Sequence, residues 1–340
     1  MEKNIQQELV SIIIALYNAE AYIAETLQSV KNQTWESIEI IVVNDGSTDG
    51  SAAVVESLKI PNLTLYDREN MGQCAASNFG IGKAKGGLIK FLDADDVLSQ
   101  NCIENMVLKY RENPNRLVFG EWQYFAKSID HSKKSSNSEF RDYENSIDWY
   151  LDVLNTREAM LAGWMWLIPA SVLKKAGGWD ERLHLMNDFE FSTRLILYSE
   201  GIGFAENAIH YYRKGLANSM TSKMNDKVAL SIYTGVSQAF NHVFSVESSE
   251  RVKKAFASQF QNLVYQFFPT QPILVDIMEV KIKSLGGSAL KPEGGALFKL
   301  LILVMPWKVV KYFQTFMYKT IWFPILVWKK NKKLKKQFGI

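Results

Sequence analysis

The chain has 340 residues, 47% hydrophobic and 22% charged, a composition that excludes a disordered protein and allows one large or two smaller domains. Its net charge of +3 is too small to indicate nucleic-acid binding. Only two cysteines occur, Cys74 and Cys102, which argues against a disulfide scaffold or a structural zinc site and favours a reducing compartment.

The beginning of the chain carries no recognisable targeting signal. Residues 1–8 are polar and lack the apolar core of a signal peptide, so we expect no secretion. No uninterrupted apolar run reaches about 18 residues, so we expect no clear membrane-spanning helix.

Short apolar runs alternate with helical segments over the first hundred residues. The runs predict buried strands at residues 9–16, 38–43, 63–66 and 88–92. The segments between them predict helices at residues 19–32, 52–58 and 73–85. This alternation predicts an α/β fold whose central sheet is mostly parallel and flanked by helices.

Polar side chains follow each of the four predicted strands, namely Asn18, then Asp45, then Arg68 and Asn70, then Asp93 and Asp95. The carboxyl ends of parallel strands share one edge of a sheet, and ligands of open α/β sheets bind there. Asp45 can accept hydrogen bonds from a base or ribose, and Arg68 can pair with a phosphate. The plainer alternatives are a turn-forming aspartate and a surface arginine. Gly72 would permit close approach of the backbone to a ligand.

Three carboxylates, Asp93, Asp95 and Asp96, follow the fourth strand almost without interruption. Carboxylates so close repel one another unless a cation lies between them. Mg²⁺ or Mn²⁺ would serve, since Mg²⁺ is usually held by one or two carboxylates together with substrate phosphates. The plainer alternative is a helix N-cap and a solvated turn.

Four motifs occur in a fixed order: SIIIALYN at 11–18, VNDGSTDGS at 43–51, ENMG at 69–72 and FLDADD at 91–96. Together they resemble the family 2 inverting glycosyltransferases, which have the GT-A fold, and the resemblance covers roughly residues 9–222. It implies that Asp45 contacts the nucleotide base, usually uracil, that Asp95 lies nearest the metal and that Asp93 lies nearer the ribose. The donor site that we infer comprises Leu16, Tyr17, Asn18, Asp45, Arg68, Asn70, Gly72, Asp93, Ala94, Asp95 and Arg213.

The acceptor side is predicted to follow residue 100. Helices are expected at residues 101–113 and 147–154, and strands at 117–120 and 122–125. Residues 126–146 are polar and charged, which predicts a mobile loop. Trp164 and Trp166 either pack in the core or form a platform on which an acceptor sugar stacks.

Members of this family usually have a Glu-Asp pair just before a helix that carries an arginine. Here the pair is Asn187 and Asp188, and the arginine is Arg194. The resemblance implies that Asp188 is the catalytic base, and we assign Asn187 to the acceptor site. Asn187 cannot ionise, so it cannot fill a role that needs a second negative charge. Asp188 can also cap the helix predicted at residues 189–199.

Many relatives have a histidine after a Tyr-Arg pair, whereas Tyr212 and Arg213 are followed by none. We therefore assign no histidine to the metal and expect His210 to be a strand residue. Arg213 is predicted to grip the donor diphosphate in an ordered lid, together with Lys214, Ser219 and Thr221.

The last third of the chain is predicted to be helical at residues 227–268 and 273–285. Residues 297–328 are rich in Leu, Phe, Trp and Val but are interrupted by lysines, Pro306 and Pro324. This pattern is typical of helices in a membrane interface, with Trp307, Trp322 and Trp328 near the headgroups. Six lysines at 329–336 would add attraction to anionic lipid. The alternative is a helical bundle or a homo-oligomer contact.

The sequence thus predicts a GT-A domain at 1–222, a helical extension at 223–295 and an amphipathic basic tail at 296–340. Within the domain, residues 1–100 would bind the nucleotide sugar and residues 101–222 the acceptor.

The predicted activity is metal-dependent, inverting transfer of a sugar, with Mn²⁺ or Mg²⁺, from a nucleotide-diphosphate donor, expected to be UDP-linked. The acceptor would be a hydroxyl of a glycan or lipid-linked glycan, in cell-surface polysaccharide or glycolipid synthesis. We expect a cytoplasmic protein at the inner face of the membrane, with no nucleic-acid partner. The alternative is an inactive, membrane-attached scaffold of polysaccharide assembly, against which the intact Asp93, Asp95 and Asp188 argue.

Overall fold

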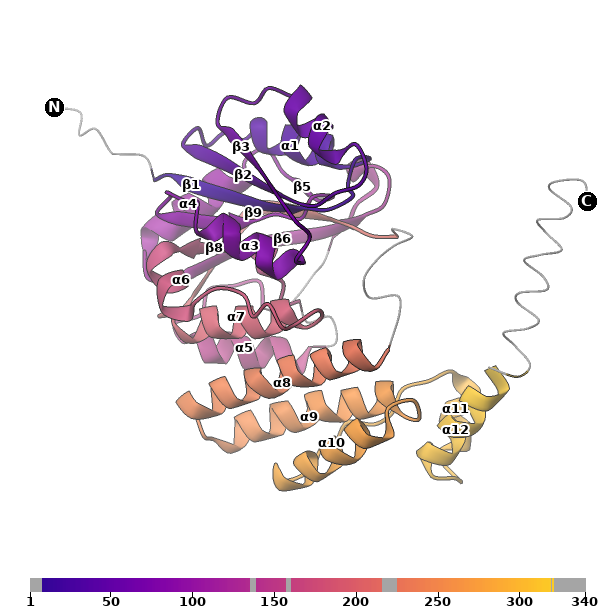
Figure 1. The fold of residues 1–340 in the computed structure, drawn as a ribbon. Helices are drawn as coiled ribbons and strands as arrows, with labels where there is room; N and C mark the ends of the chain where they lie inside the picture. The colour runs from indigo at the N-terminus through magenta and orange to yellow at the C-terminus, as the bar shows by residue number, and fades with distance from the viewer. Residues whose placement is uncertain (1–7, 135–138, 157–159, 216–224, 319, 321–340) are drawn as a thin grey trace, which may run out of the picture. The chain divides into compact units, whose positions relative to one another are not determined.

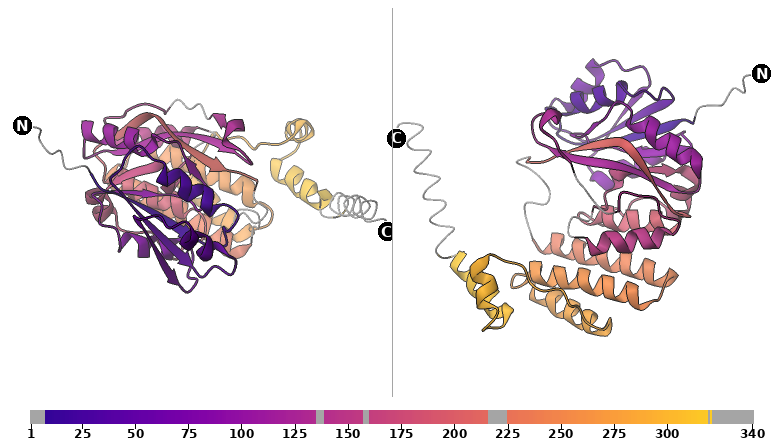
Figure 2. Two further views of the ribbon diagram at one scale, coloured as in Figure 1. Left: turned by 90° about the horizontal axis from the view of Figure 1, so that it is seen from above. Right: turned by 180° about the vertical axis from the view of Figure 1, so that it is seen from behind.

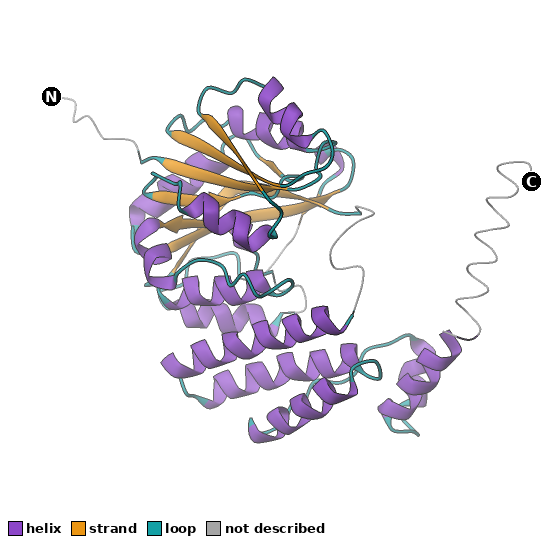
Figure 3. Ribbon diagram, viewed as in Figure 1, coloured by secondary structure: helices purple, strands orange, loops and turns teal. Residues whose placement is uncertain are grey.

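The structure, a computed structural model, describes residues 8–134, 139–156, 160–215, 225–318 and 320. The chain divides into two compact units, Met1–Val252 and Lys253–Ile340 (Figures 1 and 2). Among the described residues, strands occur in the first unit and the second unit is helical (Figure 3).

The described part of the first unit is built on a nine-stranded sheet. Its strand order is β3 (Leu63–Arg68), β2 (Ile38–Asp45), β1 (Val10–Leu16), β4 (Leu88–Phe91), β8 (Trp166–Pro169), β6 (Leu117–Phe125), β9 (Ile202–Arg213) and β5 (Val97–Leu98), with β7 (Lys133–Lys134) paired to β6. Neighbouring strands from β3 to β4 are parallel, as are β6 and β9, whereas β8, β5 and β7 run antiparallel to their neighbours. The predicted α/β fold with a mostly parallel central sheet is confirmed.

Strand β1 is buried on both faces, which explains its unbroken run of β-branched residues. On one face, Ile12 and Ile14 join a core cluster with residues of α1 (Ile23–Lys31), α2 (Ser51–Ser57) and α4 (Cys102–Glu112). On the other face, Ile13 meets α3 (Gln73–Ile81), so closely that a Cβ on Gly80 would lie 2.4 Å from its Cγ2. Helices therefore cover both sides of the sheet (Figure 3).

Several predicted boundaries differ from the structure. The helix predicted at 19–32 begins only at Ile23, because Ala19 is held in a turn by the Ser51 hydroxyl, which accepts its backbone N–H at 2.9 Å. The two strands predicted at 117–120 and 122–125 are one strand, β6, with a register shift at Gly120. Residues 126–146, predicted as a mobile loop, include the short 3₁₀ turn η1 (Ile129–His131), strand β7 and a bridge from Tyr143 to Ile202.

The other described residues of the first unit form η2 (Gly163–Met165) and the helices α5 (Ser146–Asn155), α6 (Ala170–Ala176), α7 (Asn187–Leu197) and α8 (Asp226–Val246). Helix α8 packs against α7. A Cβ on Gly235 would lie 2.9 Å from Met186, and Ser231 Oγ accepts the backbone N–H groups of His184 and Leu185. These contacts explain why the first unit extends to Val252 and not only to the predicted boundary at residue 222.

The second unit follows with α9 (Glu250–Phe267), which starts at the unit boundary, then α10 (Pro272–Ser284), α11 (Ala296–Leu301) and α12 (Trp307–Met317). The helix predicted at 227–268 is therefore two helices, separated at residues 247–249. None of the helices described is long and apolar enough to cross a membrane. Trp322, Trp328 and the lysines at 329–336 lie outside the described residues, as do Ser219 and Thr221.

Candidate active site

The ends of the parallel strands bring the predicted donor-site residues to one edge of the sheet. In the ladders, Leu16 lies opposite Asn44, and Asp45 opposite Arg68, while β4 pairs with β1 on the other side. The predicted convergence of the four strand ends is therefore confirmed. Leu16 itself is completely buried, so its assignment to the donor site is wrong: its side chain fills the core because the strand is buried on both faces.

The turn after β1 is fastened to the loop after β2. Asn18 adopts a left-handed conformation, with φ of +49°, and its Oδ1 accepts the backbone N–H of Thr48 at 2.8 Å. Its own N–H donates to the Ser47 hydroxyl at 3.1 Å. The neighbouring Tyr17 leaves 53% of its surface exposed, so it is free to meet a ligand at this edge.

The Asp45 carboxylate shapes the loop after β3. Its two oxygens accept the backbone N–H groups of Met71, at 3.1 Å, and Gly72, at 2.7 Å. Arg68 Nε lies 3.4 Å from Asp45, and Arg68 Nη1 donates to the Ala75 carbonyl at 2.6 Å. Gly72 has a φ of +94°, which a side chain would strain. Asp45 and Arg68 therefore already have structural partners, and their contacts with a donor stay a prediction.

Three carboxylates, those of Asp93, Asp95 and Asp188, lie near one another at the end of β4. Burial, together with the negative charges of Asp188 and Asp95, raises the pKa of Asp93 to about 8 against the opposing effect of Lys90. Burial likewise raises the pKa of Asp95. All three side chains remain partly open to solvent. Asp93 therefore keeps its proton at neutral pH unless a further positive charge lies beside it.

Asp188 follows Asn187 in the first turn of α7, and a hydrogen bond from the backbone fixes its carboxylate. The N-cap of α7 is Met186, in a left-handed conformation with φ of +60°, so the prediction that Asp188 caps the helix is wrong. Its Oδ1 accepts the backbone N–H of Gly163 at 2.7 Å. Burial raises the pKa of Asp188 to about 6, partly offset by that hydrogen bond. A carboxylate with this pKa can accept a proton near neutral pH.

Asp96 differs from Asp93 and Asp95 because it is completely buried and both of its carboxylate oxygens have partners within the protein. Its Oδ1 accepts the backbone N–H of Arg213 at 2.8 Å, and its Oδ2 lies 2.7 Å from His210 Nε2. His210 is a residue of β9, as predicted, and burial lowers its pKa, so the ring is uncharged. Asp96 thereby connects the turn at residues 93–96, which we term the aspartate turn, to the end of β9.

Arg213 is buried, and its guanidinium makes a hydrogen bond, an ion pair and a contact with an aromatic ring. Its Nε donates to the Asp95 carbonyl at 2.7 Å, and its Nη2 pairs with Glu25 at 2.5 Å. The guanidinium also lies over the ring of Phe125, 4.2 Å from the centroid. These contacts hold the backbone of Asp95 in place. A grip on the donor diphosphate by Arg213 stays a prediction and would require some of these bonds to be given up.

The two tryptophans predicted for the acceptor side lie in different surroundings. Trp166 has no exposed surface and donates from Nε1 to the Ser192 hydroxyl at 3.1 Å, so it is a core residue and its assignment as a sugar platform is wrong. Trp164 is 5% exposed and stacks on His210, with ring centroids 4.0 Å apart. Asn187 is buried too and donates to Cys74 Sγ at 3.2 Å.

Two residues of this region were not found from the sequence. Lys90, on β4, is 1% exposed and donates to the carbonyl of Trp164. Tyr212 lies beside the carboxylates: burial, and then the charges of the four aspartates, raise the pKa of its hydroxyl to about 12. The sequence signal for Lys90 was only the unusual occurrence of a lysine inside an apolar strand. Tyr212 had no signal in the sequence.

The residues at this edge fit a divalent cation. Asp93 and Asp95 offer carboxylate oxygens with raised pKa values, which a bound cation would lower. Within the described residues, no three His, Cys, Asp or Glu groups gather closely enough to enclose a metal. A site of one or two carboxylates, completed by substrate phosphates, is the arrangement that Mg²⁺ commonly has.

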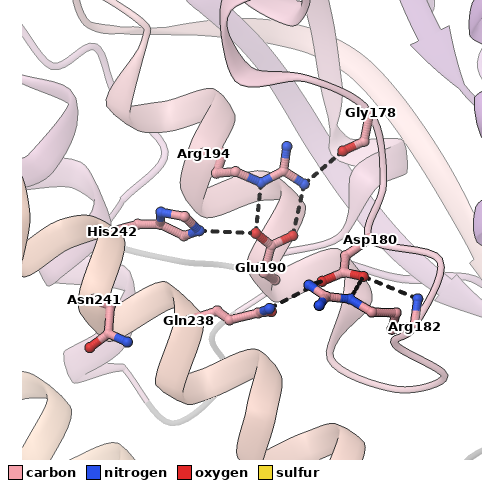
Figure 4. Close-up of a pocket in the computed structure, with 8 residues that line it drawn as sticks. All are labelled: Gly178, Asp180, Arg182, Glu190, Arg194, Gln238, Asn241 and His242. Carbon is pink, nitrogen blue, oxygen red and sulfur yellow. Dashed lines mark hydrogen bonds and ion pairs between the residues drawn. The ribbon is translucent and has the colours of Figure 1, made fainter.

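A polar cavity of about 380 Å³ lies against α7, lined by Gly178, Asp180, Arg182, Glu190, Arg194, Gln238, Asn241 and His242 (Figure 4). Glu190 lies two positions after Asp188 and so projects from a nearly opposite side of the helix. Arg194 and His242 pair with Glu190, and Arg182 and Gln238 bind Asp180. These polar contacts join the loop before α7 to α7 and α8.

Comparisons with known proteins agree with the residues at the sheet edge. Residues 11–177 match the model of glycosyl transferase family 2. Glycosyltransferase GlyG of Streptococcus pneumoniae is 27% identical over 234 residues, which cover 64% of this chain and 75% of GlyG. Minor teichoic acid biosynthesis protein GgaB of Bacillus subtilis is 28% identical over 63% of this chain but only 24% of its own length. Three other matched glycosyltransferases are covered over 59–62% of their length.

The fold also matches a solved structure. S. aureus TarS 1-349 in complex with UDP-GlcNAc superposes with a TM-score of 0.59 at 18% identity, over 82% of this chain and 89% of the TarS chain. Because the identity is low, this likeness concerns the fold alone. The family match over residues 11–177, the relatives and the fold together support a family 2 glycosyltransferase of GT-A type.

Proposed function

We propose that the protein transfers a sugar from a UDP-linked donor to an acceptor hydroxyl, with inversion at the anomeric carbon. The observation that carries the proposal is the position of Asp188, a carboxylate with a pKa of about 6, close to the Asp93 and Asp95 carboxylates at the carboxyl edge of the sheet. The UDP and UDP-GlcNAc complexes of TarS support UDP as the nucleotide.

In this proposal Asp188 acts as the general base. Its carboxylate takes the proton of the acceptor hydroxyl while the oxygen attacks the anomeric carbon, and the bond to the diphosphate breaks in the same displacement. The Gly163 N–H fixes one Asp188 oxygen at 2.7 Å and leaves the other for the acceptor. This fixed orientation keeps the base ready for the reaction.

The donor would lie along the loops that follow β1 to β4. Tyr17, Asn18, Asn70 and Gly72 line these loops, and Asp45 and Arg68 hold them in shape. Asp95, with Asp93, would hold Mn²⁺ or Mg²⁺, which supplies positive charge to stabilise the leaving diphosphate. Asp96 and Arg213 support this arrangement by fixing the backbone of the aspartate turn.

The biological setting that we propose is synthesis of a cell-envelope polysaccharide. The name of GgaB, a protein of minor teichoic acid biosynthesis, supports this setting. We further infer a cytoplasmic location. The thiols of both cysteines, Cys74 and Cys102, are free and buried, which is compatible with a reducing compartment.

The test is a panel of UDP-, GDP- and TDP-sugars assayed for release of the nucleoside diphosphate, with and without Mn²⁺ or Mg²⁺ and candidate glycan acceptors. We expect release from a UDP-sugar, its loss with a chelator, and a drop of 10²-fold to 10⁴-fold in kcat for Asp188→Asn. Isothermal calorimetry with UDP would show whether the variant still binds nucleotide. Release from a GDP- or TDP-sugar alone would overturn the choice of nucleotide, and nucleotide binding without turnover on any acceptor would favour the scaffold.

A further inference from the structure

The second unit exposes an unusual amount of apolar surface on α11, α12 and the turn between them, residues 296–317, which we term the apolar hairpin. Leu300, Leu303 and Val304 leave 63%, 78% and 80% of their surface exposed. Tyr312, Phe313 and Phe316 on α12 are also more than half exposed. Scattered exposed apolar side chains are ordinary on protein surfaces, but a continuous group of this kind marks an interaction site.

The hairpin is nevertheless folded onto the unit that carries it. Phe298 and Val310 are buried, and Trp307 packs edge-on against Tyr265 and Phe268 of the second unit. Lys308 pairs with Glu279 at 2.7 Å. One side of the hairpin is therefore anchored, so the other side is presented at a fixed place.

An apolar cavity of about 540 Å³ opens between α12 and Phe268. It is lined by Phe268, Lys308, Val309, Tyr312, Phe313 and Phe316. Five of these side chains are apolar or aromatic, and Lys308 lies 5.7 Å from the ring centroid of Phe268. A hollow of this kind offers space for hydrocarbon with one cation beside it.

The charged residues in this part of the chain are all positive. The last acidic residue of the chain is Glu293, and ten lysines follow it. Three of them, Lys299, Lys308 and Lys311, lie on the hairpin itself. Because the net charge of the whole chain is only +3, the part before residue 294 is net negative. Apolar surface bordered by lysines is complementary to a bilayer with anionic headgroups.

We propose that the apolar hairpin is a docking surface for an anionic lipid bilayer. Leu303 and Val304, in the turn between α11 and α12, enter the acyl boundary, and Lys299 and Lys311 pair with anionic headgroups. Pairing of two hairpins from two copies of the chain would bring two positively charged surfaces together, which repel, whereas an anionic bilayer attracts the same lysines. The proposal goes beyond the proposed transfer reaction and does not depend on it.

The test is flotation of the full-length protein with vesicles of phosphatidylcholine alone or mixed with phosphatidylglycerol, without any nucleotide sugar. We expect binding to the mixed vesicles, weakened by added salt. The double variant Leu303→Asn, Val304→Asn should bind at least tenfold more weakly, because it removes two side chains that would otherwise leave water. Lys299→Gln with Lys311→Gln should weaken binding severalfold on the mixed vesicles and leave binding to phosphatidylcholine unchanged.

The matched control is Ile273→Asn with Val280→Asn, which alters two apolar residues of α10 that are 75% and 72% exposed in the same unit. This control should bind like the wild type, and all variants should keep the wild-type Tm because the altered side chains are exposed. Absence of wild-type binding to mixed vesicles would overturn the proposal, and so would equal loss in the control. A dimer that the Leu303 and Val304 changes convert to a monomer, with no vesicle binding, would assign the hairpin to self-association. Because no sugar donor is present, none of these outcomes bears on the transfer activity.

Discussion

A fully buried lysine lies beneath the carboxylates of the active site. Lys90 donates to the carbonyl of Trp164, next to the Gly163 N–H that holds Asp188. Burial lowers the pKa of Lys90 to about 8, against the opposing effects of Cys102, Asp96 and Asp93. Its positive charge in turn lowers the pKa of Asp93. Lys90 therefore links the end of β4, where Asp93 lies, with the segment that binds the Asp188 carboxylate.

Lys90→Met tests this burial through the pH dependence of stability. The folded state releases the lysine proton near pH 8, whereas the unfolded chain keeps it until about pH 10.5, so the Lys90 contribution to stability rises with pH over this window. We expect the free energy of unfolding of the wild type, relative to Lys90→Met, to rise by about 2–3 kcal/mol between pH 7 and pH 10. Urea denaturation at both pH values measures this difference. Lys85→Met, at an exposed lysine, is the control, and an equal change there would contradict the explanation.

The pKa of Asp188 predicts the acid side of the rate profile. A general base works in its ionised form, so a pKa raised to about 6 should make kcat fall tenfold for each pH unit below about 6. The measurement is nucleotide release under saturating substrates from pH 4.5 to 8. Asp188→Glu, which keeps an ionisable group at a changed position, should lower kcat and shift this limb. A limb unmoved by the substitution would assign the titration to another group.

At the scale of elements, the site depends on how closely η2 approaches α7. A Cβ on Gly163 would lie 2.3 Å from Cη2 of Trp179 and 3.2 Å from Oδ1 of Asp188. Trp179 is itself fixed by stacking on Phe191 of α7, with centroids 4.1 Å apart. Glycine at 163 thus allows the backbone N–H to reach the Asp188 carboxylate.

Gly163→Ala should therefore harm both stability and catalysis. We expect a loss of about 1–3 kcal/mol in the free energy of unfolding, typical of overpacking in a close contact. kcat should fall more than the donor KM changes, since the displaced group is Asp188. Thermal unfolding and steady-state kinetics measure the two effects. Gly87→Ala is the matched control, because a Cβ there meets no atom within 4 Å. A Gly163→Ala protein with wild-type Tm and kcat would contradict the described contact.

At the scale of the whole molecule, the division after Val252 predicts a fragment that folds by itself. Residues 1–252 retain α8 and its contacts with the segment before α7. We expect this fragment to unfold cooperatively and to gain Tm with UDP, as the native state does when it binds a ligand. A fragment ending at residue 222 lacks α8 and should be less stable or aggregate. Calorimetry of both fragments measures their stability. Equal stability of the two fragments would place the end of the first folded unit at residue 222.

Much of the first unit could be predicted from the sequence because its signals are local. β-branched runs, alternating helices and polar strand ends depend only on neighbouring residues, and they predicted the parallel strands and their shared edge. The order of four motifs predicted the family. The local pattern could not reveal that Leu16 and Trp166 are fully buried or that Arg213 is engaged by the scaffold, since burial depends on elements far apart in the chain.

The amino-acid sequence by itself determined the four parallel strands, the polar residues that follow them and the charge of the C-terminal region, because each is written in contiguous residues. The tertiary structure alone decided which carboxylates meet. Asp93 and Asp188 are 95 positions apart, and their repulsion arises only when β4 and α7 come together in the fold. It also decided that the charge of Lys90 acts on Asp93 and that the Gly163 N–H binds the Asp188 carboxylate. These relations depend on distance and on exclusion of water, which a linear pattern of residues does not contain.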